Sequence, residues 1–129
     1  MIGPVIDWTM TISAAMRAAA EHAARRESIR LRRDRAIDAG TTLAGMPVAT
    51  DDKTQTRIMG AAVAAMLDPA YSVDWKMASG AFATLTGPQI IAVAQAIRAH
   101  VQACFDREAA LLADLMAGRA YDLDEGWPG

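Results

Sequence analysis

One long amphipathic segment, residues 87–117, constrains the fold of this chain more than any other feature. Apolar side chains recur along it at alternating spacings of four and three, and they are Ile90, Ala94, Ile97, Val101, Cys104, Leu111 and Leu115. This spacing predicts a helix with one continuous apolar face, interrupted only by Glu108. The helix would be on the order of 45 Å long. That exceeds what a domain of 129 residues needs for its own core, so we expect one end to project or to pair with another chain.

The N-terminal part of the chain predicts a second long helix, from Thr11 to Ala39. Helix-forming residues dominate it, no proline interrupts it, and Gly40 follows where a C-terminal cap belongs. An apolar stripe runs along its first half, made of Ile12, Met16, Ala19 and Ala23. After Arg25 the stripe thins to Ile29 and Ile37 among several arginines.

Two short hairpins are expected between the long helices, over residues 41–50 and 71–86. Ala44-Gly45 supplies a two-residue turn for the first and Ala78-Ser79-Gly80 a three-residue turn for the second. The expected cross-strand pairs are Thr41 with Val48, Leu43 with Met46, Val73 with Leu85, Trp75 with Ala83, and Met77 with Ala81. Pro47 then falls on the opposite face and predicts an edge strand, while the ring of Trp75 is expected in the hairpin core.

Capping signals define the remaining helix boundaries. Asp52 followed by Gln55 predicts a capping box that opens a middle helix, and this helix is expected to stop at Asp68, before Pro69. Thr86 followed by Gln89 predicts a second capping box, at the start of the last helix.

Together these elements predict one mostly helical α+β domain over residues 11–117. The expected order is a long N-terminal helix, a short hairpin, a helix, a second hairpin and a long C-terminal helix. Residues 1–10 form an N-terminal extension, and residues 118–129 an acidic and aromatic tail without regular structure. The charge-free stretch 77–97 is broken by polar residues, so no membrane segment is expected. The single cysteine, Cys104, excludes an internal disulfide and suits a reducing compartment.

The sequence contains no complete catalytic or metal-binding pattern. The chain has no G-x-S-x-G, no glycine-rich phosphate loop and no H-E-x-x-H, so we expect a protein that is not an enzyme and needs no cofactor. His100, Cys104 and Glu108 share one helix face and include zinc-type ligands, but they lack the further ligand that a metal site requires. We therefore place them in and beside the apolar seam and predict no metal.

Interaction residues are expected in an arginine-rich part of the first helix and near both termini. The candidates are Arg25, Arg26, Arg30, Arg33, Trp8, Tyr121, Asp122, Asp124 and Trp127. The arginines spread around the helix, and the formal net charge is −2, so nucleic acid is not the expected partner. They are instead expected to meet the acidic tail of a neighbouring subunit. The terminal aromatic residues either anchor into a partner or belong to disordered ends.

Several motifs occur in a recognisable order between Arg25 and Met116. A basic helix ends in glycine (RDRAIDAG), TDD precedes a helix containing IMGA, VDWK occupies a strand, LTGPQ opens the last helix, and HVQACF lies within that helix. This ordered set resembles a small, functionally uncharacterised domain found in tail-fibre and tail-tip proteins of tailed bacteriophages and prophages. The resemblance carries over no receptor-binding residue.

The resemblance implies a structural or adaptor subunit of a phage tail, at the tail tip or the fibre attachment region. Its partners would be other tail proteins and, given the symmetry of tails, further copies of itself as a trimer or hexamer. It would be made in the host cytoplasm and end in the virion tail. Because the domain spans nearly the whole chain, a separate accessory subunit is expected rather than a fibre shaft. The alternatives are an assembly chaperone that leaves the particle, and an arginine-rich nucleic-acid-binding regulator.

Overall fold

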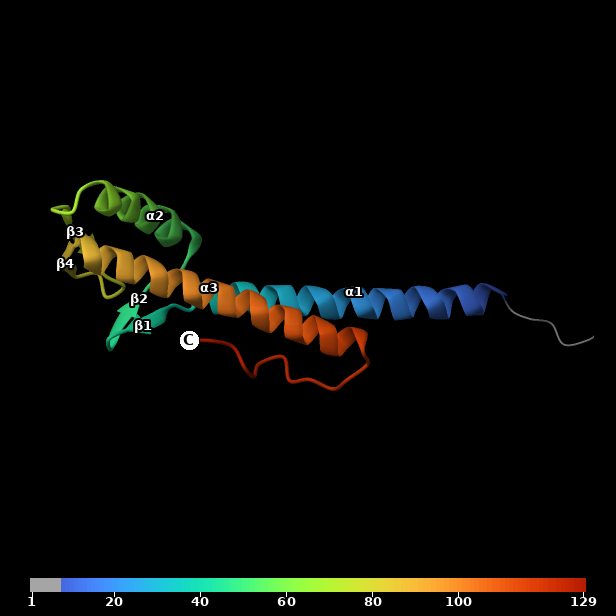
Figure 1. Cartoon of the computed structure of the whole chain (residues 1–129). Helices are drawn as coiled ribbons and strands as arrows, with labels where there is room; N and C mark the ends of the chain where they lie inside the picture. Colours follow the sequence, from blue (N-terminus) through green and yellow to red (C-terminus); the bar gives the residue numbers. More distant parts are fainter. Residues whose placement is uncertain (1–7) are drawn as a thin grey trace, which may run out of the picture.

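The computed structural model describes residues 8–129, with side chains from Ser13 onward. Its elements in chain order are α1 (Trp8–Asp38), β1 (Thr41–Leu43), β2 (Met46–Val48), α2 (Asp52–Leu67), β3 (Ser72–Lys76), β4 (Phe82–Thr86) and α3 (Gly87–Met116). This is the mostly helical α+β order expected from the sequence. Figure 1 shows α3 between the other helices, with α2 beside its first half and α1 beside its second half.

Both hairpins have the predicted register. Thr41 pairs with Val48 across the β1–β2 hairpin, and Val73 pairs with Leu85 across the β3–β4 hairpin. At the first turn Ala44 and Gly45 have φ of 50° and 80°, the left-handed pair that a two-residue turn requires. At the second turn the Met77 amide donates to the Ala81 carbonyl over 2.8 Å, as expected for a three-residue connection. Each hairpin forms a separate two-stranded sheet.

The N-cap of α2 is Asp51, and the prediction of Asp52 is wrong by one residue. Asp51 has extended backbone angles, φ −67° and ψ 165°, and its carboxylate accepts a hydrogen bond from the Thr54 amide. Asp52 is already the first helical residue, so its side chain cannot take that position. The Gln55 side-chain amide donates to the Thr50 carbonyl over 2.9 Å, two residues before Asp52, its predicted partner.

The start of α3 and the end of α2 agree with the sequence. Thr86 and Gln89 form the predicted capping box in full, with Pro88 in the first turn. The α2 helix ends at Leu67, and Asp68 adopts the extended backbone favoured before proline, with φ −135° and ψ 105°.

The core lies along one face of α3 and has three parts. The first, where α2 and the hairpins pack on α3, contains Val48, Ile58, Ala61, Leu85, Ile90, Val93 and Ile97. The middle part joins Cys104 to Ala36 and Ile37 of α1. The last part joins Leu111 and Leu115 to Ile29. The seam predicted for this helix is therefore used within the chain over its whole length.

The projecting end belongs to α1, whereas the sequence suggested that it would belong to the last helix. Figure 1 shows α1 continuing well past the end of α3. Side chains 13–28 of α1 are exposed except for the half-buried His22, and we call this stretch the projecting segment. α1 projects because of where the two helices meet. Leu115, near the end of α3, packs on Ile29, so the turns of α1 before Ile29 continue past the end of α3. In the part of the chain that the structure describes, no helix is long and apolar enough to cross a membrane.

Candidate protein-interaction site

The candidate arginines of α1 do not form one surface, as their spread around the helix indicated. Arg26 contacts the His22 ring at 2.7 Å, and Arg30 pairs with Glu27 at 2.6 Å and with Asp34 at 3.2 Å. Arg25 is exposed within the projecting segment. Most of these contacts are local pairs three or four residues apart on an exposed helix, which contribute little free energy each.

Arg33 is the exception, because it turns toward α3. Its Nη1 nitrogen donates to both carboxylate oxygens of Glu108, at 2.9 and 3.0 Å, and its Nη2 to Asp34 at 2.7 Å. The guanidinium also lies 4.8 Å from the centre of the Phe105 ring. Burial lowers the pKa of Arg33, but the hydrogen bonds to the two carboxylates outweigh burial and raise it. Arg33 is therefore a structural tie between helices and not a free interaction residue.

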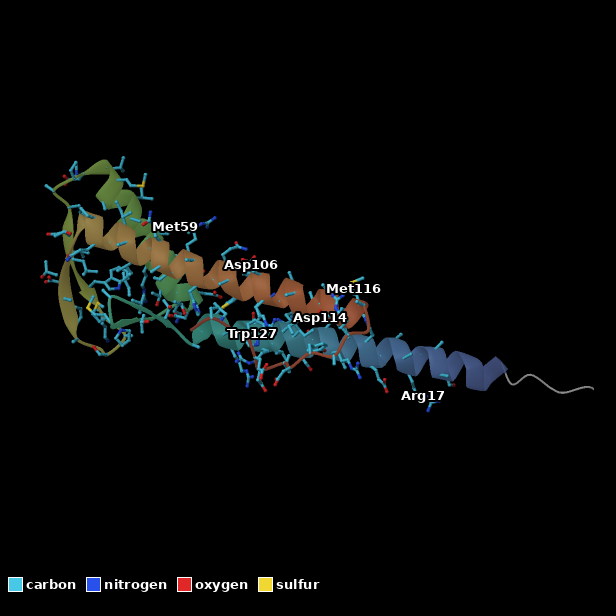
Figure 2. The ribbon with its side chains drawn as sticks, turned by 60° about the horizontal axis from the view of Figure 1, so that its bottom comes forward. Arg17, Met59, Asp106, Asp114, Met116 and Trp127 are labelled. Atoms are coloured by element: carbon cyan, nitrogen blue, oxygen red, sulfur yellow. The ribbon has the colours of Figure 1, made fainter. Side chains whose placement is uncertain are left out.

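The C-terminal tail has no helix or strand, as expected, and it folds back on α1 and α3. Figures 1 and 2 show it returning along the two helices, with Trp127 lying against α1. Trp127 packs on two parts of the core, its indole nitrogen donates to the Leu123 carbonyl over 2.7 Å, and Arg32 lies 5.1 Å from its ring centre. The ring provides apolar burial and a cation–π contact that hold the tail in place.

The predicted meeting of arginines with the acidic tail does occur, but within one chain. Asp124 accepts from Arg32 at 2.9 Å and lies 3.5 Å from Arg35. Arg107 of α3 adds a hydrogen bond to the Glu125 carbonyl at 2.9 Å. Arg32, Arg35 and Arg107 were not among the candidates. Arg32 and Arg35 are three residues apart and therefore share one helix face, but Arg30 and Arg33 have the same spacing, so the sequence alone does not distinguish the two pairs.

The remaining candidates have mixed positions. Tyr121 is half-buried and packs beside Ile29, while the Asp122 carboxylate accepts from the Asp124 amide at 2.9 Å in a local turn. α1 begins at Trp8, three residues before the predicted start at Thr11, so residues 8–10 of the expected extension are helical. The side chain of Trp8 and residues 1–7 of the expected extension lie outside what the structure describes.

His100 and Cys104 take the core positions expected of them. The His100 Nε2 donates to the Ala36 carbonyl over 2.8 Å, which ties α3 to the end of α1. Cys104 is fully buried, with Sγ 3.7 Å from that nitrogen, while Glu108 is held by Arg33. Among the described residues no three metal-binding side chains come together.

The projecting segment carries a long accessible helical surface. Ala36, Ile29, His22 and Ala15 follow one another at seven-residue intervals along α1 and so lie on nearly the same line. Ala36 and Ile29 on this line are buried against α3, His22 is half-buried, and Ala15 is exposed. The face that packs on α3 therefore continues past the end of α3. Met16, to one side of it, is 66% exposed.

A second exposed apolar area lies on α2 and the adjoining part of α3. Met59, labelled in Figure 2, is 66% exposed, Val63 51% and Phe105 42%. A groove of about 480 Å³ runs beside them between the two helices, with Ile97 and Val101 on its α3 side. Exposed apolar side chains that adjoin a groove are typical of protein-contact surfaces.

The structure is a small, mostly helical α+β domain with exposed helical faces. The chain belongs to a family described as a domain of unknown function, DUF4376, whose match covers residues 19–125. That range begins inside the projecting segment and extends to the acidic tail. No curated protein and no solved structure matches the chain.

Proposed function

We propose that this chain is a structural or adaptor subunit of a phage tail, at the tail tip or fibre attachment region, acting through protein–protein contacts. The observation that carries the proposal is the projecting segment, a helix with an alanine-lined face whose described side chains are exposed apart from the half-buried His22. The resemblance of the ordered motifs to those of tail-fibre and tail-tip proteins supports the place in the tail.

Elementary helix energetics support a partner for the projecting segment. α1 has 31 residues and packs on α3 only at its C-terminal part, whereas tertiary packing supplies most of the stability of helices in proteins. Alanine favours the helix, and a face of small side chains lets a second helix approach closely. A partner helix on this face would extend the packing that α3 already provides at Ile29 and Ala36. Further copies of the chain, as a trimer or hexamer, or another tail protein would supply that helix.

Matched double substitutions on opposite faces test the proposal. Ala15→Glu with Ala18→Glu places two carboxylates on the face continuous with α3, whereas Ala20→Glu with Ala24→Glu places the same charges on the opposite face. We expect the first variant to be lost from purified tail particles and the second to be retained, with both equally folded by circular dichroism. Retention of both variants would refute the proposed contact.

The particle preparation also separates the proposal from its alternative. A fixed copy number of the chain in mature tails supports a structural subunit, and its absence from tails that need it for assembly identifies a chaperone. Light scattering at several concentrations then gives the oligomeric state. A stable trimer or larger supports self-assembly through the projecting segment, and a monomer indicates that another tail protein is the partner.

A further inference from the structure

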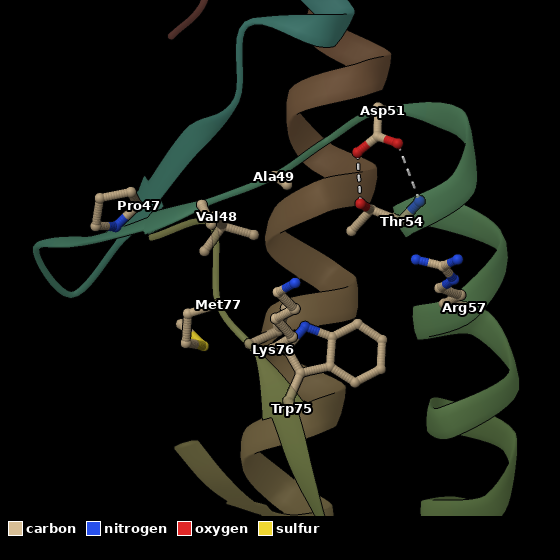
Figure 3. Close-up of a pocket in the computed structure, with 11 residues that line it drawn as sticks. Pro47, Val48, Ala49, Asp51, Thr54, Arg57, Trp75, Lys76 and Met77 are labelled. Carbon is tan, nitrogen blue, oxygen red and sulfur yellow. Dashed lines mark hydrogen bonds between the residues drawn. The ribbon is translucent and has the colours of Figure 1, made fainter. Parts of the chain in front are cut away.

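A pocket of about 360 Å³ opens where β2, the start of α2 and β3 meet, on the side of the molecule away from the projecting segment. Figure 3 shows the indole of Trp75 in its wall, which Val48, Arg57 and Lys76 also line. Trp75 is half-buried, while Arg57 and Lys76 are exposed at the rim. The pocket thus combines a flat apolar surface with two cations that come from different elements.

The charge of the pocket is unbalanced toward positive. Among the described residues, no carboxylate forms an ion pair with Arg57 or Lys76. The one acidic side chain in the wall, Asp51, is turned to Thr54, whose hydroxyl and amide both donate to it. These hydrogen bonds, of which the one from the Thr54 hydroxyl has the largest effect, hold the pKa of Asp51 below its usual range. Asp51 therefore stays charged and serves as the N-cap of the helix. The two cations are left to bind an anion from outside.

The walls of the pocket favour a peptide over a small anion. Pro47 and Val48 belong to β2, and Trp75 and Lys76 belong to β3. Each strand is paired on one side only, because both sheets are two-stranded, and each keeps a free edge. The Met77 amide donates to the Ala81 carbonyl across the hairpin. In an antiparallel pair the backbone N–H and C=O groups of successive residues point alternately toward the partner strand and away from it, so those of Lys76 point to the free edge. An extended peptide can use such groups, whereas a free carboxylate or phosphate uses the cations alone.

We propose that this pocket binds an acidic peptide segment of a partner protein, with a carboxylate between Arg57 and Lys76 and a neighbouring apolar side chain on the indole of Trp75. The pocket is separate from the projecting segment, and the proposal does not depend on a role in a phage tail. A partner bound here would approach the hairpin end of the molecule and leave α1 free for a second contact.

The test is fluorescence anisotropy with a short fluorescein-labelled peptide of alternating glutamate and leucine, added to the full chain. Arg57→Gln and Lys76→Gln each remove one cation at an exposed position, and we expect each to weaken binding about fivefold to tenfold. Lys53→Gln is the matched control, because Lys53 is an exposed cation one turn earlier on α2 and outside the pocket wall. We expect it to leave binding unchanged. Thermal unfolding followed by circular dichroism confirms that all three variants fold.

Three outcomes would overturn the proposal. One is equal binding of a peptide in which glutamine replaces glutamate, which would remove the role of the carboxylate. Another is equal weakening by Lys53→Gln, which would indicate diffuse attraction to a positive helix. The third is displacement of the peptide by inorganic phosphate at matched concentration, which would indicate a general anion site. Selective loss of binding with Arg57→Gln and Lys76→Gln, with phosphate ineffective, establishes a peptide site.

Discussion

Arg33 of α1 and Glu108 of α3 form an ion pair in which one guanidinium nitrogen lies 2.9 Å from one carboxylate oxygen and 3.0 Å from the other. Their side chains are only 17% and 15% exposed. Glu108 is the single interruption in the apolar seam of α3, and its partner explains why an acidic residue stands there. The pair joins the two long helices between the Cys104 and Leu111 levels of the core.

We expect Arg33→Ala to lower the free energy of unfolding by about 2 kcal/mol, between the values for exposed and for buried ion pairs. The physical reason is that Glu108 would keep its largely buried position without a cation. Urea denaturation followed by tryptophan fluorescence measures the change. Arg30→Ala is the control, because Arg30 and Glu27 form an exposed ion pair. Loss of this pair should change the free energy of unfolding little. Equal effects of the two substitutions would show that the Arg33–Glu108 pair adds nothing beyond a surface contact.

Trp127→Ala should release the C-terminal tail. It removes the packing on α1 and α3 and the contact with Arg32, at a cost of about 2 kcal/mol for a half-buried ring. Limited proteolysis by trypsin is the measurement, because cleavage after Arg119 should become fast when the tail detaches. Trp127→Phe keeps most of the apolar contact and should remain nearly as resistant as the native chain. Fast cleavage of the native chain at Arg119 would argue against a docked tail.

Cys104 should be unreactive in the folded protein and should make stability fall at alkaline pH. Burial raises the pKa of this thiol, with a smaller opposing effect from Arg32. Because the thiol pKa is higher in the folded than in the unfolded protein, the protonated thiol contributes its full stability below the ordinary thiol pKa. This contribution is lost as the pH rises from the ordinary pKa toward the pKa in the folded state. The free energy of unfolding should therefore decline above about pH 9 more steeply in the native chain than in Cys104→Ala. Parallel declines in the two proteins would contradict this assignment.

Asp51→Ala should destabilise the protein by about 1 kcal/mol through loss of the α2 N-cap. Asp52→Ala is the control, since Asp52 is the adjacent carboxylate and lies within the helix. Because hydrogen bonds from Thr54 lower the pKa of Asp51, its contribution is present above its ordinary pKa and is lost as pH falls through the lowered one. Thermal unfolding of both variants at neutral and acidic pH measures this. A larger effect of Asp52→Ala would restore Asp52 as the cap.

Local rules were sufficient for the secondary structure and the hairpin registers. Left-handed turn positions at Gly45 and Gly80, and the capping pair Thr86 and Gln89, act over a few residues, so the sequence determines them without the rest of the fold. The same holds for the seam of α3, whose period already specifies which face is buried. The local error at Asp51 and Asp52 arose because two adjacent carboxylates have equal capping chemistry and only the backbone distinguishes them.

The residues of the candidate interaction site could be identified only from the tertiary structure. Which arginine turns toward Glu108, which pair meets Asp124, and which helix projects all depend on where α1 and α3 cross. Likewise, Trp75, Arg57 and Lys76 share a pocket only because β3 packs near the start of α2. Periodicity fixes the faces of each helix, but the axial position of one helix against another is set by packing between residues distant in sequence, such as Ile29 and Leu115. The sequence by itself thus determined the elements and their buried faces, and the tertiary structure decided which surfaces remain for a partner.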